Sequence, residues 1–139
     1  MKGKKRVLVL CTGNSARSQM AEGLLKSIAG DKFEVESAGV APSIVRAEAI
    51  QAMREIGVDI SENRSKSVDE FATQAFDYVI TVCDNARDNC PVFPGAAIRL
   101  HWSFQDPASV DGSDEKRLAA FRRIRDQIRD TLTTFVANN

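Results

Sequence analysis

The chain has 139 residues, a common length for one domain, and its 43% hydrophobic and 27% charged residues match the composition of folded globular proteins. Its 19 Lys and Arg residues balance 19 Asp and Glu residues, so there is no excess positive charge to hold nucleic acid or an anionic membrane surface. No run reaches the roughly 20 apolar residues that a membrane span requires, and we expect a single domain over residues 1–139, a monomer that binds neither nucleic acid nor a membrane.

The first predicted elements are a strand, a loop and a helix. Residues 7–10 form a continuous apolar run, which is typical of a buried strand, and the run ends at Cys11. A helix is expected from Ser18 onward, because apolar residues recur at helical spacing and would share one face: Met20, Ala21, Leu24, Leu25 and Ile28. The loop between them therefore joins the end of a strand to the start of a helix.

The middle of the chain predicts another strand followed by two helices. Residues 33–37 alternate in polarity as a strand does, and Gly39 closes them. A helix is expected over residues 47–56, where Gly57 stops it, and a short amphipathic helix over residues 67–72.

The last third predicts two strands and a long helix. Residues 78–82 form a buried strand that ends at Cys83, and residues 97–100 form a fourth strand. The last helix, from about residue 113 to residue 136, carries an apolar stripe: Leu118, Phe121, Ile124, Ile128, Leu132 and Phe135. Strands that alternate with helices predict an α/β fold with a parallel sheet covered on both faces, whose ligands bind outside the carboxyl ends of the strands. Cys11 and Cys83 both lie at those ends.

The loop after the first strand has the pattern C-x5-R-S, in the octapeptide Cys11-Thr12-Gly13-Asn14-Ser15-Ala16-Arg17-Ser18. A loop that leads into a helix N-terminus points several backbone N–H groups at one place, and the helix dipole adds to their positive potential. Gly13 permits a backbone conformation that other residues resist, and Asn14 tolerates a positive φ. Ser15 and Ser18 supply hydroxyl donors, and the planar fork of Arg17 suits two oxygens of a tetrahedral oxyanion. The pattern predicts an oxyanion-binding loop.

Cys11 stands at the mouth of this loop, where hydrogen-bond donors and positive charge favour the thiolate, which is the nucleophilic form. We therefore interpret Cys11 as a nucleophile that attacks the bound oxyanion. The alternative is a buried strand-end cysteine with Arg17 as an ordinary helix-start residue. The spacing alone does not exclude that alternative, but the strand, glycine, serine and helix around it favour the functional interpretation.

Asp106-Pro107 follows the fourth predicted strand. An Asp before a Pro commonly starts a turn, and that is the simple explanation of the pair. Beside an oxyanion loop, however, expulsion of a hydroxyl needs a proton donor, and a carboxyl near an anion has its pKa raised toward that task. We therefore favour Asp106 as the general acid.

Cys83 and Cys90 are the other two of the three cysteines, and they are separated by a polar segment. A zinc site would need tighter spacing and more ligands, because His101 is the single histidine. Two independent cysteines remain an alternative, but an exposed polar segment is a poor place for idle thiols. The number of cysteines is odd, and the apolar run that follows the basic N-terminal residues is too short for a signal peptide. Both observations indicate thiols that are kept reduced in the cytoplasm. We interpret His101 and Trp102 as structural.

The segment that joins Cys83 to Cys90 predicts a short helix, because Asp84 and Asn85 are good N-cap residues and Pro91 disfavours helical geometry at the residue before it. Seven helical steps would hold the two Cα atoms roughly 10 Å apart, whereas a disulfide tolerates about 7 Å. A disulfide between these cysteines would therefore require the helix to loosen.

Together, C-x5-R-S after the first strand, the Cys83 and Cys90 pair, and Asp106-Pro107 resemble the thioredoxin-coupled arsenate reductases built on the low-molecular-weight tyrosine phosphatase fold. The resemblance covers nearly the whole chain, including residues 11–22, 37–39, 59–61, 82–91 and 101–102 and the last helix from about residue 121. It implies a three-layer α/β fold, with a four-stranded parallel sheet, helices on both faces and a phosphatase-type anion loop after the first strand.

The resemblance also implies a reaction. Cys11 attacks arsenate, whose oxygens the loop and Arg17 hold, and Asp106 protonates the departing hydroxyl. Cys83 then attacks the Cys11 sulfur, arsenite leaves, and Cys90 takes over the disulfide, which thioredoxin reduces. Extra thiols suit this substrate because arsenic(V) accepts two electrons when a second thiol attacks, whereas a phosphorus adduct can only be hydrolysed. No cofactor is expected, and glutaredoxin or a small thiol is the alternative reductant.

Some reductases of this family hold a potassium ion beside the loop. The residues that match its ligands are Asn14, Glu22 and Ser37, but this chain has Lys66 near the position of an acidic ligand. We expect the lysine to replace the cation, and no bound metal.

Three other functions would use part of the same pattern. A low-molecular-weight protein tyrosine phosphatase would share the loop, but Ala108 follows Asp106-Pro107 where those phosphatases usually carry an aromatic residue. A phosphocarrier domain needs neither Arg17 with Asp106 nor a pair of further thiols. A thiol redox sensor would leave the anion loop unexplained.

Overall fold

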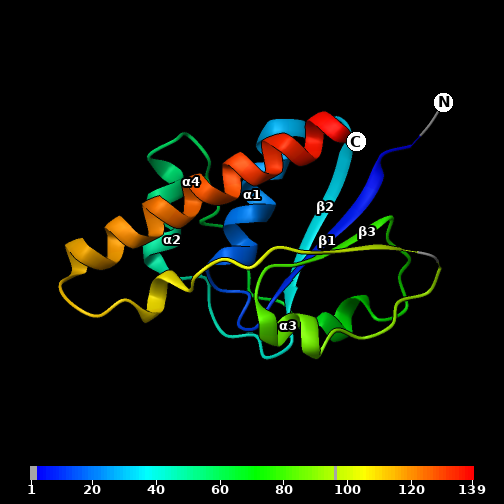
Figure 1. Cartoon of the computed structure of the whole chain (residues 1–139), viewed down its shortest axis with the longest axis horizontal. Helices are drawn as coiled ribbons and strands as arrows, with labels where there is room; N and C mark the ends of the chain where they lie inside the picture. Colours follow the sequence, from blue (N-terminus) through cyan, green and yellow to red (C-terminus); the bar gives the residue numbers. More distant parts are fainter. Residues whose placement is uncertain (1–2, 96) are drawn as a thin grey trace.

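The structure, a computed structural model, describes residues 3–95 and 97–139. They contain a four-stranded sheet with helices on both of its sides (Figure 1). The strands are β1 (Lys5–Cys11), β2 (Phe33–Gly39), β3 (Tyr78–Thr81) and β4 (Ile98–His101). They lie in the order β2-β1-β3-β4, and every neighbouring pair is parallel. This confirms the fold class expected from the sequence.

The strand β1 is the centre of the core. Its apolar run from Val7 to Leu10 is fully buried, as expected for a parallel strand that has packed layers on both faces. β1 pairs with β2 on one side and with β3 on the other. The connections after β1 and after β3 therefore lead to opposite edges of the sheet, and the order of the strands reverses between β1 and β3. In open parallel sheets this switch point leaves a crevice at the carboxyl ends of the strands. Cys11 ends β1, and Cys83 lies two residues beyond β3.

Three longer helices lie on one side of the sheet and α3 lies on the other (Figure 1). The longer helices are α1 (Arg17–Ala29), α2 (Ala47–Arg54) and α4 (Asp114–Asn138); the shorter elements are η1 (Val68–Phe71), α3 (Asp84–Asp88) and η2 (Pro107–Ser109). The predicted helix over residues 67–72 is thus a 3₁₀ turn, and the fourth strand begins one residue later than predicted. No helix within the described residues is both long and apolar enough to cross a membrane.

The long helix α4 covers the sheet with the predicted stripe. Ser113 caps its start by accepting a hydrogen bond from the Lys116 N–H, and the stripe residues Phe121, Ile124, Ile128, Leu132 and Phe135 are buried. A buried arginine, Arg125, ties α4 to the end of α2 by donating to the Ala52 carbonyl at 2.8 Å and to Glu55 at 3.2 Å. The sheet and its helices therefore give a fixed base to the loops at the carboxyl ends of the strands.

Candidate active site

The backbone of residues 11–17 is folded so that its carbonyl groups point outward. The carbonyls of Cys11, Thr12, Gly13 and Ser15 accept hydrogen bonds of 2.9 to 3.2 Å from the N–H groups of Val40, Ala41, Ser43 and Arg46. In the described part of the chain, the N–H groups of Gly13 to Ala16 donate to no protein acceptor. Backbone groups are rarely left unpaired, so a ring of unused donors at the N-terminus of α1 is a site for an anion.

Asn14 adopts the left-handed conformation that the sequence predicted, with φ of 47°. Its side chain is fully buried, and its amide donates to Ser18 at 2.8 Å and to Ser37 at 3.0 Å. Gly13 does not have a positive φ, so the predicted reason for a glycine there is wrong. A Cβ on Gly13 would lie 3.3 Å from the hydroxyl oxygens of Ser15 and Ser43, so a larger residue there would require these two side chains to move slightly.

Arg17 begins α1 beside this ring of donors. One of its guanidinium nitrogens donates to the Phe104 carbonyl at 3.0 Å, which fixes the side chain across the loop. Its Nε is buried without a hydrogen-bond partner in the described residues. An unpartnered buried guanidinium N–H is costly unless an acceptor such as an oxyanion oxygen meets it.

Cys11 and Cys83 lie together after the neighbouring strands β1 and β3, at the edge of the sheet where the sequence placed both of them. Both thiols are free and buried, and they lie close enough that each changes the pKa of the other. The Thr12 hydroxyl lies 3.3 Å from the Cys83 sulfur and accepts a hydrogen bond from the Asn85 amide at 2.9 Å. A second thiol is thus in place for attack on any adduct that forms at Cys11.

The two thiols titrate as a pair. The Cys11 thiol, together with the Thr12 hydroxyl and the Ala86 N–H, donates to Cys83 and lowers the pKa of Cys83 to about 5. The pKa of Cys11 is raised, first because it donates to Cys83 and then because it is buried, although Arg17 and the Thr12 N–H oppose this. The sequence predicted a lowered pKa for Cys11. Because the two thiols titrate as a pair, the lowered pKa belongs to the pair, and the lowered pKa of Cys11 itself stays a prediction.

Cys90 stands apart from these two thiols. It follows α3, whose N-cap is Cys83 and whose C-cap is Asn89, so a short helix separates the two cysteines as predicted. Burial raises the pKa of the Cys90 thiol, and the nearby Arg99 opposes this rise. All three cysteines are free in the structure.

Asp106 caps η2 by accepting a hydrogen bond from the Ala108 N–H at 3.0 Å. This is the turn function that its position before Pro107 also predicted. Two residues before Asp106, the Phe104 carbonyl accepts a hydrogen bond from Arg17, and this bond ties the Asp106 segment to the anion loop. Within the described residues, the Asp106 carboxylate has no hydrogen bond to Cys11 or Arg17. The general-acid role thus stays a prediction.

A buried ion cluster supports the loop from behind. Glu22 accepts from the Ser37 hydroxyl at 2.6 Å, and the Lys66 ammonium lies 3.3 Å from Glu22 and 3.2 Å from Glu36. The backbone N–H of Lys66 also donates to the Asn14 side chain at 2.8 Å. A potassium ion does not fit these residues, because the ammonium of Lys66 already lies against the Glu22 carboxylate that would hold the ion.

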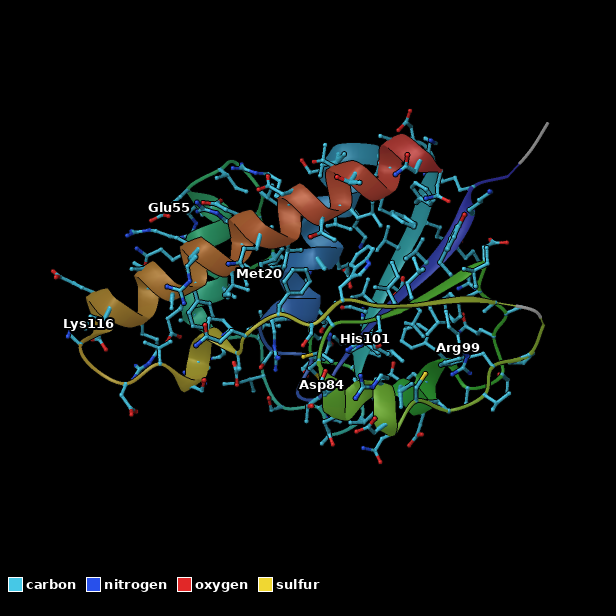
Figure 2. All side chains as sticks on the ribbon, in the orientation of Figure 1. Met20, Glu55, Asp84, Arg99, His101 and Lys116 are labelled. Atoms are coloured by element: carbon cyan, nitrogen blue, oxygen red, sulfur yellow. The ribbon has the colours of Figure 1, made fainter. Side chains whose placement is uncertain are left out.

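A second network, which the sequence reasoning missed, holds the start of α3. His101 is hydrogen-bonded to Thr81 at 2.7 Å and to Asp84 at 3.0 Å, and Ser103 also donates to Asp84. Figure 2 shows Asp84, His101 and Arg99 gathered around α3. His101 is hydrogen-bonded to Asp84, the residue that follows Cys83. This structural role agrees with the interpretation of His101 from the sequence. Only the tertiary fold brings these residues together, so no local signal could have revealed the network.

Comparison with known proteins agrees with this geometry. The family model described as low molecular weight phosphotyrosine protein phosphatase matches residues 6–138. An arsenate reductase of Halalkalibacterium halodurans is 48% identical over 132 residues, 95% of each chain. A solved arsenate reductase in the phosphate binding state has 33% identity and a TM-score of 0.77, over 96% of this chain and 98% of that chain. The thioredoxin-dependent arsenate reductase of Corynebacterium glutamicum has 31% identity and a TM-score of 0.71, over 99% of this chain and 65% of that chain.

These matches confirm the resemblance found in the sequence, both to the fold and to the reductases built on it. The chain belongs to the low molecular weight phosphotyrosine protein phosphatase family, in which it is similar to proteins named arsenate reductase.

Proposed function

We propose that this protein reduces arsenate to arsenite through a relay of three cysteines, with thioredoxin as the final reductant. The observation that carries the proposal is the neighbouring pair of free, buried thiols, Cys11 and Cys83, beside a ring of unused N–H donors. A phosphatase needs one nucleophilic thiol, whereas a reductase needs a second thiol that attacks the sulfur of the first and forms a disulfide with it. The names of the relatives support the same activity.

The first step is the attack of Cys11 on arsenic. The N–H groups of Gly13 to Ala16 and the guanidinium of Arg17 hold three arsenate oxygens and stabilise the charge that builds on them. The neighbouring Cys83 holds a negative charge in the pair, so the Cys11 proton can pass to Cys83 as the Cys11–arsenic bond forms. Cys83 then releases this proton to solvent and is a thiolate again before the second step. Asp106 protonates the hydroxyl that leaves.

The second step transfers two electrons. The Cys83 thiolate attacks the sulfur of Cys11, a sulfur–sulfur bond forms, and the bond between Cys11 and arsenic breaks with its electron pair on arsenic. Arsenic(V) becomes arsenic(III), which leaves as arsenite. The Thr12 hydroxyl and the Ala86 N–H, which contact the Cys83 sulfur, favour the thiolate needed for this attack.

The third step moves the disulfide outward. Cys90 attacks Cys83, which releases Cys11 and leaves a Cys83–Cys90 disulfide for thioredoxin. α3 must unwind for this bond to form; the helix has five residues, of which Ala86 is buried, so little apolar area is lost. Three free cysteines also suit a cytoplasmic location, where thiols stay reduced.

A coupled assay tests the proposal. Arsenate should drive NADPH oxidation in the presence of thioredoxin and thioredoxin reductase, at a rate well above hydrolysis of an aryl phosphate. Cys90→Ser should abolish the coupled turnover but leave the phosphatase rate unchanged, since the hydrolysis needs no relay. Faster aryl phosphate hydrolysis with no arsenate-dependent NADPH oxidation would instead identify a phosphatase.

A further inference from the structure

A small cavity of about 120 Å³ lies between α3 and β4, next to Cys90. Three side chains that can carry positive charge line it: Arg87 of α3, and Arg99 and His101 of β4. The cavity is separate from the anion loop, and the reaction steps above leave its two arginines without a role. Figure 2 shows Arg99 and His101 on the same stretch of chain, opposite α3.

Of these three residues, only Arg99 is directed at the cysteine. One guanidinium nitrogen of Arg99 donates to the Cys90 sulfur at 3.5 Å, and the other donates to the Pro91 carbonyl at 2.8 Å. Arg87 instead pairs with Asp88 at 3.2 Å. Both ring nitrogens of His101 are already hydrogen-bonded, one to Thr81 and the other to Asp84.

We propose that Arg99 is a positioning residue for Cys90, holding its sulfur and favouring its thiolate before the last disulfide exchange. The inference rests on the proposed function. In that exchange the Cys90 thiolate attacks the Cys83 sulfur and the Cys83–Cys90 bond forms. The Cys11–Cys83 bond breaks with its electron pair on Cys11, so there is no net oxidation.

Cys90 needs such help because it lacks the donors that Cys83 has. Its half-buried position raises the pKa of its thiol, and the charge and hydrogen bond of Arg99 are what oppose this rise. A cysteine attacks as the thiolate, so a charge beside the sulfur increases the reactive fraction at neutral pH. The second bond, to the Pro91 carbonyl, fixes the backbone next to Cys90 and keeps the sulfur against the guanidinium.

Alkylation of each cysteine as a function of pH tests the inference without arsenate. The reduced enzyme is treated with iodoacetamide, and peptide masses give the rate at Cys90 separately from the other two sites. Arg99→Met should move the Cys90 midpoint upward and slow alkylation near neutral pH by about three- to tenfold, since the guanidinium is partly solvated. Arg99→Lys should restore part of the Cys90 alkylation rate. Arg87→Met removes another charge from the same cavity and should change the Cys90 alkylation rate by less than about twofold.

A single turnover separates this inference from the proposed function. One equivalent of arsenate is added without reductant, samples are quenched in acid, and the disulfides are mapped over time. The parent should reach the Cys83–Cys90 bond quickly, whereas Arg99→Met should accumulate the Cys11–Cys83 bond. No arsenate-induced disulfide in the parent would refute the proposed function. A normal disulfide in the parent, with unchanged exchange and alkylation in Arg99→Met, would refute the role of Arg99 alone.

Discussion

Replacement of Lys66 by methionine tests how the buried ion cluster supports the anion loop. Methionine keeps most of the apolar stem and removes the ammonium, which lies within 3.3 Å of Glu22 and Glu36 on a side chain that is 11% exposed. Losing a charged hydrogen bond to the buried Glu22 costs about 1.5–3 kcal/mol, and the pair with the more exposed Glu36 adds at most about 1 kcal/mol. We therefore expect Lys66→Met to lower the free energy of unfolding by about 2–4 kcal/mol.

Lys26→Met is the matched control. Lys26 contacts the same carboxylate at 2.9 Å, but its side chain is 51% exposed, so its loss should cost less than about 1 kcal/mol. Urea unfolding followed by circular dichroism measures both variants. The dissociation constant for phosphate should also rise in Lys66→Met alone, because the Lys66 segment binds the Asn14 side chain. Equal and small losses for the two lysines would refute the reasoning.

The pH dependence of this effect has a definite sign. Burial alone would raise the pKa of Glu22, but the Ser37 hydroxyl, Lys66 and Lys26 outweigh it and hold the pKa below its ordinary value of 4.5. A carboxyl whose pKa is lowered by folding stabilises the protein above the unfolded value and loses that contribution as the pH falls through the folded value. The stability gap between parent and Lys66→Met should therefore be full at neutral pH and narrow below about pH 4.5.

Four further results are expected. Cys83→Ala should lower the pKa of Cys11, measured by thiolate absorbance or alkylation rate, because it removes the hydrogen-bond acceptor that raises that pKa; an unchanged midpoint would contradict the pairing. The same variant should form the Cys11 adduct but produce no catalytic arsenite, whereas arsenite release near the parent rate would refute the role of Cys83. Arg17→Ala should weaken phosphate binding by tenfold or more, read by calorimetry. Hydrogen exchange over residues 84–89 should be faster in the oxidised protein than in the reduced one, and equal protection would show that α3 does not unwind.

Much of the site could be predicted because its loop is local in the sequence. A strand, seven residues and a helix start define where the N–H groups converge, and Asn14 took the positive φ that its residue type permits. The sequence also placed Cys11 and Cys83 at the same edge of one parallel sheet, and the resemblance implied that they meet. The strand order was not, because it depends on crossovers that no local pattern encodes.

What the sequence could not give are contacts between distant segments. The His101 ring reaches Asp84 across 17 positions of the chain, and the Arg17 guanidinium reaches the Phe104 carbonyl across 87. The contact of Lys66 with Glu22 was expected only through the resemblance. The raised pKa of Cys11 has the same origin, since it depends on a hydrogen-bond partner 72 residues away, as their numbers show. Residue type predicted a thiolate, and the partner decided which sulfur keeps the proton.

The relay is tested most directly by mapping disulfides in Cys90→Ser after a single equivalent of arsenate. Cys11 and Cys83 are already neighbouring buried thiols, so without the third thiol the reaction should stop at a Cys11–Cys83 disulfide, with one arsenite released per protein. Peptide masses without reduction identify the bond, and arsenite is measured by chromatography. We predict equal amounts of the two products. Arsenite release without a Cys11–Cys83 disulfide, or a protein that binds arsenate and keeps all its thiols free, would contradict the relay.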